Sequence, residues 1–129
     1  AGDGRRVVFA TYHSSPRIAE AQAIGAPGFD LIVADEAHHC TGKWESHFAT
    51  VLDEGKLQSE KRLFMTATPR IVSRRIKDMA GELDIDVASM DDEAVFGRDF
   101  HVLTFGEAIA GDLPEFHVFA HQAAQPGIF

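Results

Sequence analysis

The chain lacks several features that would assign it to a specialised class of protein. It has 129 residues and one cysteine, Cys40, which excludes an intrachain disulfide and predicts a reducing cytoplasm. No apolar run approaches the roughly 20 residues that span a bilayer. Residues 1–6 also lack the apolar core of a signal peptide. We therefore expect a cytoplasmic protein with no membrane partner.

Positive charge is also scarce. The chain carries 12 Lys and Arg against 20 Asp and Glu, a formal net charge of -8. This balance argues against a freestanding domain that binds nucleic acid through bulk charge alone. A local basic stretch remains, and either phosphate contact or a solvated helix face would explain it. Its members are Arg70, Arg74, Arg75 and Lys77.

The apolar and turn-forming residues predict alternating strands and helices. Strands are expected at residues 7–12, 29–34 and 61–68, and helices at residues 14–24, 44–52 and 72–81. Ser14-Ser15-Pro16 suits the start of the first helix, and Gly25 suits its end. This alternation predicts an α/β fold with a parallel sheet and right-handed crossovers.

The pattern weakens after Glu82. Short strands are expected at residues 84–88, 100–103 and 116–119, with a short helix at residues 105–110. We expect one partial domain, with a core over residues 5–81 and a C-terminal extension over residues 82–129.

An apolar run that ends in two carboxylates is the most informative stretch. Leu31-Ile32-Val33-Ala34 is typical of a strand buried on both faces, and Asp35 and Glu36 follow directly. Ligands bind at the carboxyl ends of parallel strands. Two acids there can hold a magnesium ion and polarise a water for phosphoryl transfer.

Three short motifs occur in an informative order. Asp35-Glu36-Ala37-His38 resembles the Walker B motif of superfamily 2 helicases in its DEAH form. Thr66-Ala67-Thr68, followed by Pro69, resembles motif III, and Thr11-Tyr12-His13-Ser14 resembles motif Ib. Residues 90–97 and 105–109 are similar to the late part of the first motor domain of type III restriction subunits and related bacterial and phage helicases. The resemblance covers most of the chain.

The resemblance implies a three-layer RecA-like sheet with flanking helices, and a site for ATP and Mg²⁺. Asp35 would hold the magnesium ion, largely through water, and Glu36 would position and activate the attacking water. His38 would couple the nucleotide site to the rest of the motor.

The other two motifs imply contacts outside the nucleotide. Thr66 and Thr68 would link hydrolysis to domain movement. Thr11 and Ser14, at a helix start with free N–H groups, would contact a phosphate of DNA or RNA.

The sequence has no Gly-x-x-x-x-Gly-Lys-Ser/Thr to cradle phosphates. Neither Gly42-Lys43, expected as a helix lead-in, nor Gly55-Lys56 precedes a Ser or Thr. Motif Ia and the second motor domain are missing too. We expect the numbering to begin partway through the fold. We also expect an open apolar sheet edge that invites pairing with another chain. The missing Walker A segment and second motor domain would come from the parent or another chain, or the chain would self-associate.

Three functions follow from these patterns. The first is a fragment of a DEAH-box ATP-dependent helicase or translocase that is inactive alone. The second is a non-catalytic remnant or assembly module with the same fold. The third is a nuclease-like metal site at Asp35 and Glu36, which needs further carboxylates that the sequence does not place.

Other chemistry is weighed against structural roles. Zinc ligation by His38, His39, Cys40 and His47 fits no common spacing, and Cys40 has no identifiable base that would make it a nucleophile. Trp44 and Phe48 suit base stacking or core packing. Residues 90–93 suit a cation site or a solvated turn.

Overall fold

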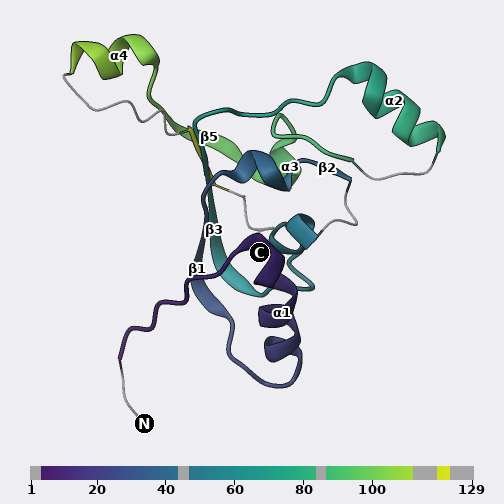
Figure 1. Cartoon of the computed structure of the whole chain (residues 1–129), viewed down its shortest axis with the longest axis vertical. Coiled ribbons are helices and arrows are strands. Elements are labelled where there is room, and N and C mark those ends of the chain that lie inside the picture. The colour runs from purple at the N-terminus through teal and green to yellow at the C-terminus, as the bar shows by residue number, and fades with distance from the viewer. Residues whose placement is uncertain (1–3, 44–46, 84–86, 112–118, 123–129) are drawn as a thin grey trace, which may run out of the picture.

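Four strands form the main sheet of this computed structural model, which describes residues 4–43, 47–83, 87–111 and 119–122 (Figure 1). Their order is β1-β3-β6-β5. Their bounds are β1 Phe29–Ala34, β3 Ser59–Thr66, β5 Arg98–Val102 and β6 Phe119–Gln122. A separate two-stranded sheet pairs β2, Gly42–Lys43, with β4, Val87–Ala88.

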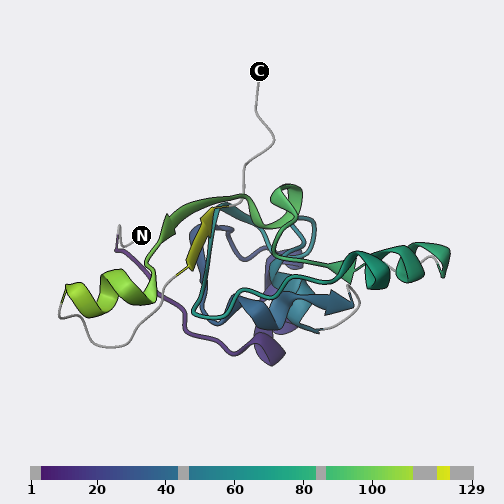
Figure 2. The same ribbon diagram turned by 90° about the horizontal axis from the view of Figure 1, so that it is seen from above.

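Helices and 3-10 turns connect these strands. The helices are α1 Ser15–Ala23, α2 Arg74–Glu82, α3 Glu93–Phe96 and α4 Phe105–Ala110, and the 3-10 turns are η1 Tyr12–Ser14, η2 Ala37–Cys40 and η3 His47–Val51. Figures 1 and 2 show α1 beside the β1 and β3 strands, whereas α2 and α4 extend away from the body. None of the helices in the described ranges is long and apolar enough to cross a membrane.

The pair β1 and β3 is parallel, and Ala34 lies level with Phe64. This pair and its flanking helices confirm the predicted α/β fold. The sheet is parallel only here, because β6 pairs antiparallel with β3 and with β5. The expectation of parallel strands throughout is therefore corrected to a mixed sheet.

One side chain of α1 holds the beginnings of both parallel strands. Gln22 is buried, and its amide Nε2 donates to the carbonyls of Pro27 at 3.3 Å and Gln58 at 3.1 Å. Its Oε1 accepts from the Gln58 N–H at 2.7 Å. The helix itself begins with Pro16 in its first turn and is followed by Gly25 at a φ of 113°, as the sequence predicts.

Aromatic packing joins the two parts of the chain in the core. Phe64 of β3 and Phe96 of α3 are fully buried and meet edge-on, with ring centroids 5.1 Å apart. Around them are Ala34, Ala37, Cys40, Val51, Leu52, Leu57, Ala88 and Met90.

A guanidinium is buried beside this core. The Nε of Arg62 donates to the Val51 carbonyl at 3.0 Å, and Nη2 donates to the Leu57 carbonyl. Glu54 lies 3.3 Å from Nη1. These partners satisfy a charge that would otherwise be costly to bury.

The predicted first strand is wrong. Residues 4–11 have no regular structure, and Val7, Val8 and Phe9 are 75%, 59% and 94% exposed. The preference of a residue type for strands reflects burial and packing against neighbouring strands. No described strand lies beside this stretch to supply either of them.

The expected helix at residues 44–52 is also corrected. Its described part is the short 3-10 turn η3, and Trp44 lies outside the described residues. Gly42-Lys43 forms the strand β2, with Gly42 at a φ of 106°, instead of leading into a helix.

Most later elements lie near the predicted positions, but the short helix α3 was not predicted. Helices α2 and α4 are confirmed, and α4 begins with a capping box between Thr104 and Glu107. Strands β4, β5 and β6 begin or end within a few residues of the expected bounds. Residues 84–86 and 116–118 lie outside the described residues.

Strand β1 is covered on one face only, so the prediction of burial on both faces is wrong. Leu31 and Val33 are 52% and 49% exposed, whereas Ala34 is buried. Leu63 of β3 lies beside Val33 in the register, and Met65 follows on the same side. We call Leu31, Val33, Leu63 and Met65 the outer apolar face.

Truncating the central aromatic pair should be costly. The Phe64→Ala substitution is expected to lower the free energy of unfolding by about 3–5 kcal/mol, because it leaves a cavity against Phe96. Chemical denaturation followed by circular dichroism measures this change. Phe100→Ala is the control, since Phe100 is 64% exposed, and it should change stability by no more than about 0.5 kcal/mol. Equal effects would show that the described core is wrong.

The buried thiol should make the fold sensitive to alkali. Burial raises the pKa of Cys40 from 9.0 to about 11, and the nearby Tyr12 hydroxyl lowers it only in part. Because the folded pKa is the higher one, this stabilisation is present below pH 9 and is lost as pH rises through 11. The loss should be about 2 kcal/mol. Denaturation midpoints at pH 8–11 should fall less in Cys40→Ala. Identical slopes would contradict the prediction.

Candidate functional site

The two carboxylates lie where the sequence predicts. Strand β1 ends at Ala34, and Asp35 and Glu36 follow it, both exposed. Glu36 has left-handed backbone angles, φ 50° and ψ 44°, before η2 begins. For a residue other than glycine, this conformation costs about 1 kcal/mol or more. The Asp35 carboxylate offsets part of this cost by accepting the Glu36 N–H at 2.9 Å.

Three predicted site residues surround one imidazole nitrogen. The Nδ1 of His38 lies 2.9 Å from the Thr66 hydroxyl and 3.3 Å from the Thr68 hydroxyl. It also lies 3.4 Å from the Glu36 carboxylate. Strand β3 ends at Thr66, which is buried, and the Thr68 N–H donates to the Thr66 hydroxyl at 3.1 Å. The structure therefore joins the ends of β1 and β3 through His38.

The turn that contains His38 is fixed from behind. The buried Thr41 hydroxyl donates to the His38 carbonyl at 2.7 Å. The His39 N–H donates to the Glu36 carbonyl at 3.0 Å. These bonds hold η2 as a short 3-10 turn directly behind the acid pair.

The segment that was predicted to contact a nucleic-acid phosphate lies close to the acid pair. The hydroxyls of Thr11 and Ser14 are 3.1 Å apart, and the Ser14 N–H donates to the Thr11 carbonyl at 2.9 Å. Both residues are exposed, and α1 begins directly after them. We call residues 11–14 the Thr11–Ser14 turn. Its exposed hydroxyls suit a phosphate oxygen. The N–H groups of Ser14 and Ser15 instead donate to the Thr11 and Tyr12 carbonyls, and Pro16 has no N–H, so the expected free N–H groups are not present at this helix start.

Sequence reasoning missed one residue of the site, Tyr12. Its hydroxyl donates to the Asp35 carbonyl at 2.5 Å. The ring packs against Phe48 and His39, at centroid distances of 5.5 Å and 6.5 Å. Burial raises the pKa of Tyr12, and the charges of Cys40, Asp35 and Glu36 raise it further, so the hydroxyl remains a donor. The available signal was a tyrosine within the motif itself.

Other candidate residues do not join this site. Arg74 and Arg75 are exposed on α2, which extends away from the body (Figure 1), and this favours a solvated helix face. The Arg70 N–H donates to the sulfur of Met90 at 3.4 Å. Phe48 packs against Tyr12 and His13, which favours packing over base stacking.

The donor set at the acid pair suits a hard cation. Within the described ranges, no group of three or more His, Cys, Asp or Glu side chains could hold a metal ion by itself. Magnesium is commonly held by one or two carboxylates, with phosphate and water oxygens completing its shell. The exposed Asp35 carboxylate fits that requirement, with Glu36 beside it.

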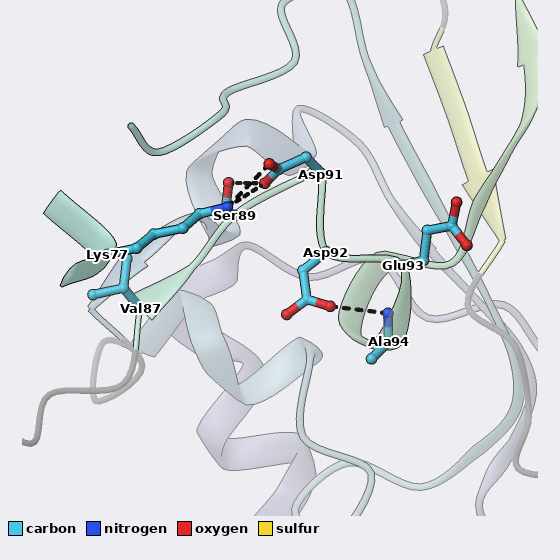
Figure 3. Close-up of a pocket in the computed structure, with 7 residues that line it drawn as sticks. All are labelled: Lys77, Val87, Ser89, Asp91, Asp92, Glu93 and Ala94. Atoms are coloured by element: carbon cyan, nitrogen blue, oxygen red, sulfur yellow. Dashed lines mark hydrogen bonds and ion pairs between the residues drawn. The ribbon is translucent and has the colours of Figure 1, made fainter. Parts of the chain in front are cut away.

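A hollow of about 580 Å³ lies elsewhere, and Figure 3 shows the residues that line it. Lys77 pairs with Asp91 at 2.8 Å, and Ser89 also bonds to that carboxylate. The Lys77 hydrogen bond, followed by the Ser89 bond, lowers the pKa of Asp91. Asp92 caps α3 by accepting the Ala94 N–H at 3.0 Å. These contacts favour the solvated turn over the cation site, and no residue predicted to bind the nucleotide or nucleic acid lines the hollow.

Solved structures of restriction enzymes resemble this fold. The chain is 39% identical to the Type ISP restriction-modification enzyme LlaGI, solved with a DNA substrate mimic, at a TM-score of 0.62 over 81% of this chain and 8% of that one. It is 36% identical to the ATP-dependent Type ISP enzyme LlaBIII, solved bound to DNA, at a TM-score of 0.59 over 78% of this chain and 7% of that one.

Sequence comparisons find relatives that are described as helicases. A protein of African swine fever virus (isolate Pig/Kenya/KEN-50/1950), described as "Probable helicase", is 43% identical over 65 residues, which are 50% of this chain and 6% of the relative. The homologue of isolate Tick/Malawi/Lil 20-1/1983 is 39% identical over 79 residues, 58% of this chain and 8% of the relative. The chain thus spans a small part of these relatives.

Residues 2–71, which are 70 of 129, match the family described as Type III restriction enzyme, res subunit. With the motifs and the restriction-enzyme fold, this match shows that the chain belongs to that family and carries part of a superfamily 2 helicase-like motor domain.

Proposed function

We propose that the chain carries the acid pair and coupling residues of a DEAH-type motor that hydrolyses ATP to move along DNA. The observation that carries this proposal is the contact of His38 with Glu36, Thr66 and Thr68. DNA is favoured over RNA because LlaGI and LlaBIII were solved with DNA or a mimic of it.

Each carboxylate has a distinct role in this proposal. Bound ATP and magnesium supply the γ-phosphoryl group and the charge that polarises it. Asp35 would hold the metal, largely through water, and one of its carboxylate oxygens also accepts the Glu36 N–H. Glu36 is exposed enough to meet a water, so its carboxylate orients that water and accepts its proton.

His38 transmits changes at the nucleotide site to the rest of the motor. Its ring contacts a hydroxyl at the end of β3 and the carboxylate after β1. A change in the position of Glu36 therefore alters the hydrogen bonds of Thr66 and Thr68. The Thr11–Ser14 turn binds a phosphate of the DNA backbone, which requires no particular base sequence.

The rest of the motor comes from outside these residues. The sequence contains no Gly-x-x-x-x-Gly-Lys-Ser/Thr, so the parent or another chain supplies the phosphate loop and the second motor domain. The outer apolar face leaves Leu31 and Val33 half exposed, so it is where the rest of the motor packs in this proposal. Residues 5–81 and 82–129 belong to one partial domain in this proposal.

Replacing the proposed general base should abolish hydrolysis in the complete motor. In the parent polypeptide that joins this chain to its phosphate loop, Glu36→Gln should lower kcat by about 10²–10⁴-fold, because the water loses its proton acceptor. Phosphate release measures kcat, and fluorescent ATP should still bind. Glu82→Gln, a change of the same kind at the end of α2, should leave kcat unchanged.

The same assays separate the two leading functions. The 129-residue chain alone should not turn over ATP. Turnover by the isolated chain that is lost in Glu36→Gln would refute the need for a phosphate loop. No hydrolysis by a folded complete parent would favour the non-catalytic assembly module.

The isolated chain should self-associate through the outer apolar face. Leu31→Gln combined with Val33→Thr should shift the chain toward monomer in sedimentation velocity at micromolar concentration, because it removes half-exposed apolar surface from β1. Ile76→Gln is the control, since Ile76 is 53% exposed but lies on α2. A monomeric wild-type chain, or an equal shift in the control, would contradict this assignment.

A further inference from the structure

One side chain bridges the two parts of the proposed site. The Thr11–Ser14 turn and the acid pair are more than twenty positions apart in the sequence, yet the Tyr12 hydroxyl reaches the Asp35 carbonyl at 2.5 Å. Tyr12 is itself the second residue of that turn. A displacement of the turn therefore acts directly on the residue that precedes Glu36.

The carbonyl that Tyr12 contacts belongs to the peptide group between Asp35 and Glu36. The N–H of the same peptide group donates to the Asp35 carboxylate at 2.9 Å. Hydrogen bonds thus hold this plane at both of its polar ends. The torsion beyond that plane is the φ of Glu36, which is left-handed at 50°. Orientation of the plane consequently helps to set the direction of the Glu36 side chain.

Tyr12 is also held firmly enough to transmit movement. The Ser15 hydroxyl donates to the Tyr12 carbonyl at 2.7 Å, which ties the tyrosine to the start of α1. Phe48 packs against both Tyr12 and His13, with centroid distances of 5.5 Å and 5.0 Å. The outer side of the turn, where Thr11 and Ser14 lie, is exposed. A ligand can therefore reach the turn without displacing the aromatic cluster.

We propose that Tyr12 is a positioning residue that links occupancy of the Thr11–Ser14 turn by a DNA phosphate to the alignment of Glu36. Through the Asp35–Glu36 peptide group, a bound phosphodiester fixes the turn, the tyrosine and the carboxylate together. The proposal rests on the proposed function of the turn and of Glu36. It adds a route by which the DNA strand controls hydrolysis.

The first test uses the isotopically labelled 129-residue chain and a single-stranded oligothymidylate. In the wild-type chain, the amide resonances of Thr11, Ser14 and Glu36 should shift together during the titration. Tyr12→Phe removes only the hydroxyl. The turn should then still shift with the same affinity, whereas the shift of the Glu36 amide should fall at least about threefold, because the link to the peptide group is gone.

Thr41→Val is the matched control. It also removes a hydroxyl that donates to a backbone carbonyl near the acid pair, but this hydroxyl bonds to His38 and not to residues 11–14. Its Glu36 amide should respond to the oligonucleotide as in the wild type. An undiminished Glu36 response in Tyr12→Phe would overturn the proposal, as would a wild-type turn that binds the oligonucleotide without any shift at Glu36.

The second test separates the link from the proposed chemistry. In the complete parent motor, Tyr12→Phe should lower the DNA-stimulated kcat about tenfold with less than about a twofold change in KM for ATP, because alignment and not nucleotide binding is lost. An unchanged stimulated kcat would overturn the proposal. A wild-type parent without ATPase activity would refute the proposed function, whereas a loss of the Glu36 amide response in Tyr12→Phe would still support the link.

Discussion

The parallel pairing of β1 with β3 is the constraint on which the site depends. Ala34 lies level with Phe64, so the residues that follow both strands emerge at the same edge of the sheet. His38 can then reach Thr66 at 2.9 Å although they are 28 positions apart. Gln22 fixes the beginnings of the same two strands. A slip of this register would separate His38 from its hydroxyl partners.

Much of the site could be predicted because its residues lie beside strongly patterned strands. The apolar run before Asp35 and the strand before Thr66 place both groups at the carboxyl edge without any knowledge of distant contacts. The stretch at residues 7–12 has the same kind of composition, but its burial depends on a neighbouring strand. Tyr12 was missed because a hydrogen bond to a backbone carbonyl leaves no trace in the identity of Asp35.

The two sides of the sheet obey different constraints. Phe64 and Phe96 are fully buried on one side, whereas Leu31 and Val33 remain half exposed on the other. The strands beside β1 do not determine this difference in exposure. It depends on whether a further layer of secondary structure covers that face of the sheet. The antiparallel addition of β6 to β3 likewise depends on residues far along the chain, and local patterns do not determine its direction.

The geometry at His38 also limits which hydrogen bonds its ring can form. Thr66, Thr68 and Glu36 all lie within 3.4 Å of a single ring nitrogen. That nitrogen has one lone pair or one proton, so it forms one strong hydrogen bond at a time. The three contacts therefore compete for that nitrogen, so a stronger bond to one partner weakens the bonds to the other two.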